Sequence, residues 1–303
     1  MEIISERKKF FAAFIMTYRR NSTLQTTIEA LFNQTFPPEK IVIVDNDIEF
    51  SAKPIFELLS HYPLEYYNVG YNSGPAGASK KGLEILTAQE YKWIAWVDDD
   101  DPPVFENCFE LLLQVGENAP NCGCVGAVGH YFNRKNGIIT RVQDDELLKP
   151  GIIEVDQIAG GMCKIVASKV ISEKNILPDE KLFFSFEDLD FDLKLQNGGF
   201  KLYCSRDLYL KHRTKFKTQG ITKQRGNKKD INKLWRDYYS TRNILFILSY
   251  NKLNLAVIKT LFRSFIKILL SFRYGLNYGM KNARYIFKAI LDFSFNKKGQ
   301  IHL

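Results

Sequence analysis

Two groups of carboxylates in this sequence could do chemistry. The first, Asp98–Asp101, directly follows the apolar run 93–97 and precedes two prolines. Four acids at the mouth of a buried strand repel one another, so a cation is expected there. Mg²⁺ and Mn²⁺ prefer oxygen ligands, and on carboxylates they usually accompany a phosphate. A solvated acidic turn is the alternative interpretation.

The second group lies in segment 183–192, where phenylalanines surround several acids, among them Glu187 and Asp188. These acids open a predicted helix that ends at Gly198-Gly199. Carboxylates in a first helical turn are stabilised by the helix dipole, which is a purely structural explanation. The aromatic neighbours favour another one, because partial burial raises carboxyl pKa values, as a general base requires.

Alternating strand and helix patterns in the first half of the chain position these groups. Continuous apolar runs at 10–16, 41–44 and 93–97 predict buried strands, with helices between them. The alternation indicates an α/β fold, with a mostly parallel sheet and helices on both faces. Ligands bind such sheets beyond the carboxyl ends of the strands, so Thr17, Asp45 and the first acidic group should converge there.

The second half of the chain is less regular. Strands are predicted at 124–132, 158–167 and 207–210, with a hairpin turn at 136–137. From Trp235 onward the apolar residues recur at helical spacing, so this part of the chain is predicted to be helical.

Charge divides the chain into two regions. Residues 211–303 contain 21 Lys and Arg against 3 acids, whereas residues 1–210 contain 21 against 31. We therefore predict a catalytic domain at 1–215 and a basic, helical C-terminal region at 216–303, which should bind polyanions. In 253–272 the apolar side chains face away from the cations, which is typical of helices that lie on a membrane surface. Ordinary packing on the main domain is the alternative.

Cysteine usage and the N-terminus bear on the compartment. The five cysteines form no paired CxxC set, and the segment 1–9 is polar and charged. An odd number of cysteines without a signal peptide favours reduced thiols in a cytoplasm. No uncharged apolar stretch approaches the roughly 18 residues that span a bilayer.

In order along the chain, the motifs resemble those of family 2 glycosyltransferases with the GT-A fold, nearest the bacterial rhamnosyl- and galactofuranosyltransferase branch. The matching pieces are Phe14–Arg19, Ile41–Asn46, Asn72–Gly77 with Gly82, Val97–Asp101, Phe186–Asp190, His212 and Arg236–Asn243. Each piece is weak alone, but the first six in register are specific, and Arg236–Asn243 resembles a segment common in that branch. The final sixty residues fall outside the resemblance.

The resemblance implies a role for each matching position. Contacts to the nucleotide sugar are implied for Thr17, Arg19, Asp45, Asn72, Gly74, Asp98 and Asp99. Within this set, Asp45 would accept a hydrogen bond from the base. Asp188 would be the general base, with Glu187 beside it.

The resemblance also implies a divalent metal, Mn²⁺ or Mg²⁺, on the diphosphate. Asp98 and Asp100 would hold it, and His212 would complete the site from the strand predicted before it. Because four acids follow one another, Asp99 and Asp101 remain alternatives for the metal-binding pair.

The implied activity is inverting, metal-dependent transfer of rhamnose, galactofuranose or a similar sugar. The donor would be a dTDP- or UDP-linked sugar, and the acceptor a lipid-linked or polymeric surface glycan of the cell wall, O-antigen or capsule. We expect a cytoplasmic protein, peripheral on the anionic inner face of a bacterial membrane, with no nucleic-acid partner. The sequence leaves the donor, the acceptor and the oligomeric state open.

Two other functions are considered. A sugar-phosphate nucleotidyltransferase would carry a Gly-rich signature after the first strand, where Thr17-Tyr18-Arg19-Arg20 stands instead. A non-catalytic protein that binds nucleic acid or membranes would explain the basic third of the chain, but not the two acidic groups.

Overall fold

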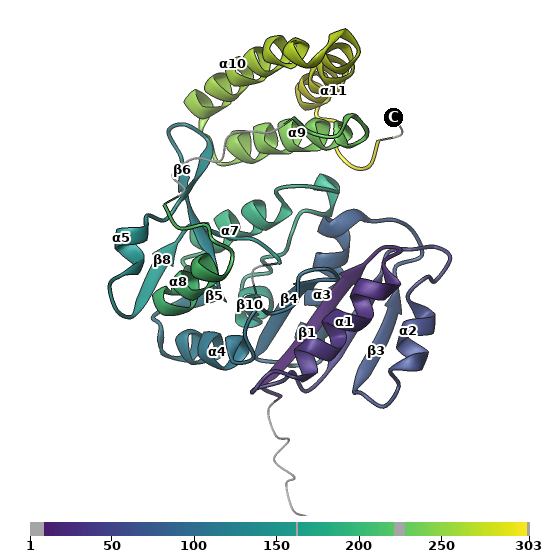
Figure 1. Cartoon of the computed structure of the whole chain (residues 1–303), viewed down its shortest axis with the longest axis vertical. Helices are drawn as coiled ribbons and strands as arrows, with labels where there is room; N and C mark the ends of the chain where they lie inside the picture. The colour runs from purple at the N-terminus through teal and green to yellow at the C-terminus, as the bar shows by residue number, and fades with distance from the viewer. Residues whose placement is uncertain (1–8, 162, 221–227, 302–303) are drawn as a thin grey trace, which may run out of the picture.

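The computed structural model describes residues 9–161, 163–220 and 228–301, and is centred on one large sheet (Figure 1). In this part of the chain the sheet has eight strands in the order β3-β2-β1-β4-β10-β5-β11-β8. Their bounds are β1 Phe11–Thr17, β2 Ile41–Asp45, β3 Leu64–Asn68, β4 Trp93–Asp98, β5 Cys122–Gly126, β8 Ile152–Val155, β10 Lys164–Ala167 and β11 Lys201–Ser205. A small antiparallel sheet contains β6 Gly129–Asn133, β7 Ile138–Arg141 and β9 Gln157–Ile158.

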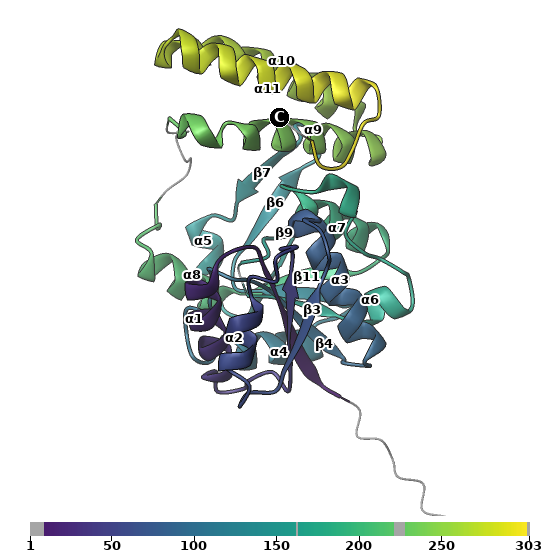
Figure 2. The same ribbon diagram turned by 90° about the vertical axis from the view of Figure 1, so that its right-hand side faces the viewer.

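The four N-terminal strands are parallel neighbours, as the apolar runs predict. β1 and β2 are buried almost throughout, because helices cover both faces of the sheet. Helices α1 (Asn21–Phe32) and α2 (Lys53–Leu58) lie on one side of the sheet and α3 (Gly74–Ala88) on the other (Figure 2). The four carboxyl ends therefore meet at one edge.

The three predictions for the middle of the chain need correction. The predicted strand 124–132 is two strands, β5 and β6, which belong to different sheets. The predicted strand 158–167 is likewise divided into β9 and β10. The predicted strand 207–210 lies in helix α8 (Arg206–Lys215), whose first turn is capped by Ser205. In each case the apolar pattern shows burial but does not show where the chain changes direction.

In the described part of the chain, five further helical segments lie between β4 and β11. They are α4 (Cys108–Asn118), α5 (Asp144–Leu147), α6 (Lys169–Ser172), the 3₁₀ turn η1 (Glu180–Leu182) and α7 (Glu187–Asn197). Helix α4 packs on β5, β10 and β11, and α7 packs on β9 and β11. The hairpin turn predicted at 136–137 joins β6 to β7.

Three long helices follow, as the sequence predicts: α9 (Trp235–Tyr250), α10 (Asn254–Ser271) and α11 (Leu276–Ser294). A 3₁₀ turn, η2 (Ile231–Lys233), precedes α9, and η3 (Phe272–Tyr274) joins α10 to α11. Helix α9 shares a buried apolar cluster with α7, η1 and β6, so it is packed against the α/β part of the chain. Helices α10 and α11 lie beyond α9, at the end of the molecule opposite the start of β1 (Figures 1 and 2). None of the described helices is long and apolar enough to cross a membrane.

Helix α10 turns its small and hydroxyl-bearing side chains inward, where Ala256, Thr260 and Ser264 are buried. Its large apolar side chains face outward, together with those of η3 and α11. We call this set the outer apolar face: Leu255, Ile258, Phe262, Phe265, Ile266, Leu269, Leu270, Phe272, Leu276, Met280, Phe287 and Leu291.

Candidate active site

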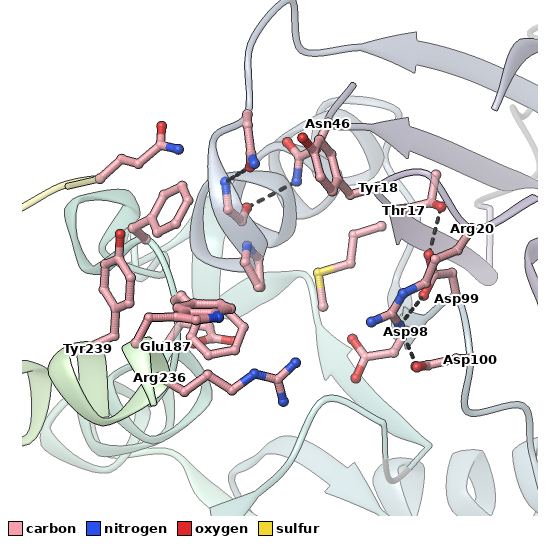
Figure 3. Close-up of a pocket in the computed structure, with 18 of the residues that line it drawn as sticks. Thr17, Tyr18, Arg20, Asn46, Asp98, Asp99, Asp100, Glu187, Arg236 and Tyr239 are labelled. Atoms are coloured by element: carbon pink, nitrogen blue, oxygen red, sulfur yellow. Dashed lines mark hydrogen bonds and ion pairs between the residues drawn. The ribbon is translucent and has the colours of Figure 1, made fainter. Parts of the chain in front are cut away.

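One cavity of about 790 Å³ extends from the carboxyl ends of β1, β2 and β4 to the C-terminal helices. Its polar half includes Thr17, Tyr18, Arg20, Asn46, Asn72, Asp98, Asp99 and Asp100. Its other half includes Phe183, Phe184, Glu187, Trp235, Arg236, Tyr239, Tyr285, Gln300 and Ile301. Figure 3 shows the labelled residues of the two halves on opposite sides of the cavity.

Three of the four consecutive acids, Asp98, Asp99 and Asp100, line this cavity. The Thr17 hydroxyl donates to Oδ2 of Asp99 at 2.7 Å, and Nη1 of Arg20 donates to Oδ1 at 3.1 Å. The same guanidinium pairs with Asp100. Among the described residues no cation pairs with Asp98, so its charge remains uncompensated.

The first acidic group suits a hard divalent cation. Burial, followed by the charges of Asp100 and Asp99, raises the pKa of Asp98 to about 7, and a cation would relieve that repulsion. Asp101 lies outside the cavity wall, against Gly161, where an added Cβ would come within 2.5 Å of its Oδ2. Within the described ranges, no three His, Cys, Asp or Glu side chains could hold a metal by themselves. A cation on Asp98 and Asp100 would therefore need ligands from a diphosphate and water, as is usual for Mg²⁺.

His212 does not join this cavity, contrary to the sequence-based expectation. It lies on α8 and lines a separate small pocket with Phe105 and Cys108. Its ring is 4.6 Å from that of Phe216, centroid to centroid. Burial lowers the pKa of the imidazole. The expectation came mostly from the resemblance and partly from a strand predicted at 207–210; that segment is helical, and His212 faces the small pocket.

Two residues predicted at the nucleotide also lie outside the cavity wall. The buried carboxylate of Asp45 accepts hydrogen bonds from the N–H groups of Asp47 at 2.8 Å and Ala52 at 3.0 Å, and from the Tyr66 hydroxyl at 2.7 Å. The chain itself therefore uses this carboxylate to shape the turn after β2. Arg19 has a left-handed backbone, with φ 58°, and pairs with Asp47 instead of facing the cavity.

Asn72 and Gly74, predicted to border the nucleotide, line the cavity. Oδ1 of Asn72 accepts from the Gly74 N–H at 3.0 Å, and Nδ2 of Asn46 donates to the Gly74 carbonyl at 3.1 Å. Glycine is needed at position 74 because φ is +67° and an added Cβ would lie 2.1 Å from the carbonyl oxygen of Phe183. The close approach is thus to the loop before α7.

Helix α7 begins with the pair Glu187 and Asp188. Oε2 of Glu187 is buried without a hydrogen-bond partner in the described part of the chain. Burial, followed by the charge of Asp188, raises the pKa of Glu187 to about 8. Asp188 accepts hydrogen bonds from the Gln157 amide and the Leu189 N–H, and its charge helps to raise the pKa of Asp98. The two acidic groups are therefore electrostatic neighbours.

The loop before α7 is strained and is held by α9. Phe183, Ser185 and Phe186 have φ of 64°, 73° and 67°, a region that costs roughly 1–2 kcal/mol for each non-glycine residue. The buried amide of Asn243 donates to three carbonyls of this loop, at 3.0, 2.8 and 2.9 Å. The buried guanidinium of Arg242 donates to the same loop and to the chain after α11. These two residues thus position the start of α7.

The sequence did not indicate that aromatic residues and one arginine of the C-terminal helices line the cavity. Trp235 and Tyr239 come from α9, and the guanidinium of Arg236 lies 5.4 Å from the Phe184 ring and 5.5 Å from the Trp235 ring. Among the described residues no carboxylate pairs with Arg236, so its charge can meet an anion in the cavity (Figure 3). The signal in the sequence was segment 236–243, which carries the resemblance but received no role.

The raised pKa of Glu187 predicts a pH-dependent stability. Its proton is bound more tightly in the folded than in the unfolded chain, so the free energy of unfolding should fall as the pH rises from about 5 to about 8. Glu187→Gln should remove this loss. At about pH 9 the free energy of unfolding of the variant should exceed that of the native chain by at least about 1 kcal/mol, which is less than one pKa unit is worth. Urea denaturation in a buffer that contains a metal chelator measures the free energy of unfolding at each pH.

Glu57→Gln, on the exposed surface of α2, is the matched control and should follow the native pH dependence. If the free energy of unfolding fell equally with pH in the native chain and in Glu187→Gln, the assigned burial of Glu187 would be contradicted.

Comparisons with known proteins agree with this geometry. Residues 12–160 match the model of glycosyl transferase family 2. A galactofuranosyltransferase, GlfT1 of Mycobacterium tuberculosis, is 33% identical over 203 residues, covering 62% of this chain and 64% of that protein. The match thus spans slightly less than two thirds of that relative. The dTDP-rhamnosyl transferase RfbF of Shigella flexneri is 25% identical over 221 residues, covering 70% and 71%.

The fold has solved counterparts. The mannosyltransferase PcManGT of Pyrobaculum calidifontis, in complex with GDP-Man and Mn²⁺, superposes with a TM-score of 0.54 at 11% identity, covering 96% of this chain and 89% of that one. At this identity the likeness concerns the fold alone. The matched family model, the named relatives and the shared fold agree: residues 12–160 form a domain of glycosyl transferase family 2 type, and the chain has the GT-A fold.

Proposed function

We propose that the protein is an inverting, metal-dependent glycosyltransferase. It would move rhamnose, galactofuranose or a similar sugar from a dTDP- or UDP-linked donor to a lipid-linked or polymeric surface glycan. One observation carries this proposal: the acids after β4 and Glu187 at the start of α7 line one cavity, and the charges of Asp98, Glu187 and the adjoining Asp188 influence one another. The named relatives support the sugar classes.

The polar half of the cavity would receive the nucleoside diphosphate. Thr17 and Arg20 keep Asp99 in place, and Asn72 and Gly74 border the space beside it. Asp98 and Asp100 would hold Mn²⁺ or Mg²⁺, which would supply positive charge to the departing diphosphate. Mn²⁺ in the solved mannosyltransferase complex supports this role. Arg236 would add a second positive charge from the opposite wall.

The other half would receive the acceptor, with Asp188 as the general base. Burial, followed by the charge of Asp188, raises the pKa of Glu187 to about 8, so Glu187 is mostly protonated near neutral pH and is a poor base. The resemblance assigns the base to its neighbour Asp188. An acceptor hydroxyl is a poor nucleophile until a carboxylate removes its proton. Attack on the face of the sugar opposite the nucleotide would invert the anomeric configuration in one displacement.

We further propose a place in cell-wall, O-antigen or capsule synthesis, at the cytoplasmic face of a bacterial membrane. Residues 211–303, with 21 Lys and Arg against 3 acids, support attraction to an anionic surface.

Thermal unfolding with nucleotides tests the donor assignment. UDP or dTDP with Mn²⁺ should raise the melting temperature, because a ligand that binds only the native state stabilises it. ADP with Mn²⁺ is the control and should raise it less. Asp98→Asn should abolish the metal-dependent part of the shift. No shift with any nucleoside diphosphate and metal would contradict the proposal.

Product analysis separates the reaction classes. With a panel of nucleotide sugars, a glycosyltransferase releases the nucleoside diphosphate, whereas a nucleotidyltransferase uses or releases pyrophosphate. A retained anomeric configuration in the product would contradict the single displacement.

A further inference from the structure

We propose that the outer apolar face of α10, η3 and α11 docks on an anionic lipid bilayer, with its apolar side chains inserted at the headgroup boundary. Large, contiguous apolar surfaces are rare on monomeric proteins and mark interaction sites. Here Phe262 and Leu269, one heptad apart on α10, are 66% and 72% exposed, and Leu276 and Met280 continue the surface on α11.

The inward face of α10 shows that this exposure is built into the fold. The buried side chains of α10 are Ala256, Thr260, Ser264, Ile268 and Ser271, and Val257 packs against a buried cluster. Helix packing thus uses a mostly small face and leaves the largest apolar residues outside. An ordinary surface helix has the opposite arrangement, with its large apolar residues against the core. The sequence left open that α10 simply packs on the main domain. The small face provides that packing, and the outer apolar face remains exposed.

The charge of α10 and α11 indicates what binds to the outer apolar face. The segment 254–294 carries seven Lys and Arg and a single acid, Asp292, which is buried. Arg273 and Arg284 are exposed beside the apolar side chains. A second copy of the chain would bring these like charges close to one another, whereas anionic headgroups complement them. Apolar insertion with a cationic border is the pattern of an interfacial helix.

Helix α11 connects this surface to the cavity. Tyr285 lines the cavity, whereas Phe287 and Leu291 of the same helix belong to the outer apolar face. The cavity thus lies about one helix diameter, roughly 10–12 Å, from the proposed bilayer surface. Given the proposed transfer reaction, this distance favours an acceptor that is anchored in the membrane.

Vesicle cosedimentation tests the docking without any substrate. The native chain should bind vesicles of phosphatidylcholine with phosphatidylglycerol more tightly than vesicles of phosphatidylcholine alone. The double variant Phe262→Ser with Leu269→Ser should bind about 10²-fold more weakly, because two large side chains no longer leave water. Arg273→Gln with Arg284→Gln should lose the preference for the anionic vesicles.

The matched control is Ile48→Ser with Leu148→Ser, two apolar residues with 64% and 73% exposure on other parts of the molecule. This variant should bind vesicles like the native chain. Both apolar variants should keep the nucleotide-induced shift in melting temperature, which separates failure of docking from failure of the proposed function.

A fluorescent label reports insertion directly. All five native cysteines are buried, so Leu269→Cys offers one accessible thiol for an environment-sensitive dye, and Leu148→Cys is its control. The dye at position 269 should shift to the blue with anionic vesicles, and the dye at 148 should not. Unchanged vesicle binding by the double variant, or a concentration-dependent dimer without lipid that this variant abolishes, would overturn the proposal.

Discussion

Asp188→Asn is expected to lower sugar transfer by about 10²–10⁴-fold, the range of general-base assistance. The asparagine keeps the size of the side chain but cannot accept the proton of the acceptor hydroxyl. Binding of the nucleoside diphosphate should change little, because the cation-binding acids are in the other half of the cavity. Steady-state turnover and the nucleotide-induced shift in melting temperature measure the two effects separately.

Glu187→Gln is the matched control, since it makes the same chemical change at the neighbouring position. With its pKa raised to about 8, Glu187 is mostly protonated at neutral pH, and glutamine resembles that state. The variant should therefore keep turnover within about tenfold of the native enzyme at pH 7. If Glu187→Gln loses turnover and Asp188→Asn keeps it, the base is Glu187.

Asn243→Ala is expected to lower the free energy of unfolding by about 3 kcal/mol, because three carbonyls of the loop before α7 lose their donor inside the protein. The loop contains three left-handed residues, so it should relax once the amide is removed. Turnover should then fall further than nucleotide affinity, since Asn243 holds the loop that leads into Glu187 and Asp188. Urea unfolding and turnover measured on the same preparation test both statements.

Asn251→Ala on the C-terminal end of the same helix is the control. This side chain makes hydrogen bonds to Asn197 and to the Ile247 carbonyl at a partly exposed site. Its loss should cost below about 1 kcal/mol and leave turnover unchanged. Equal effects of the two variants would show that Asn243 has no special part in positioning α7.

Much of the first half of the chain could be predicted, because its elements are local. The strands at 41–44 and 93–97 are unbroken apolar runs, and a parallel sheet requires burial on both faces. Since parallel strands end at one edge, Thr17 and Asp98 could be placed near each other before any coordinates were known.

The errors share a physical cause. Asp45 and Thr17 both end parallel strands. However, the Asp45 carboxylate accepts hydrogen bonds from Tyr66 and from the turn after β2, so its partners are inside the protein. His212 follows apolar residues that suit either a strand or a helix, and the cap at Ser205 decides for the helix. Such outcomes depend on partners that are distant in sequence.

The sequence by itself determined the parallel sheet, the convergence of acids at its edge and the amphipathic character of the C-terminal helices, because each follows from the local period of apolar and charged residues. Only the tertiary structure decided that Arg20 rather than Arg19 reaches the cavity, that α9 completes the site, and that α10 turns its large apolar side chains outward. Packing selects among faces and rotations that a local pattern leaves equivalent, and that selection is made by contacts between segments far apart in the chain.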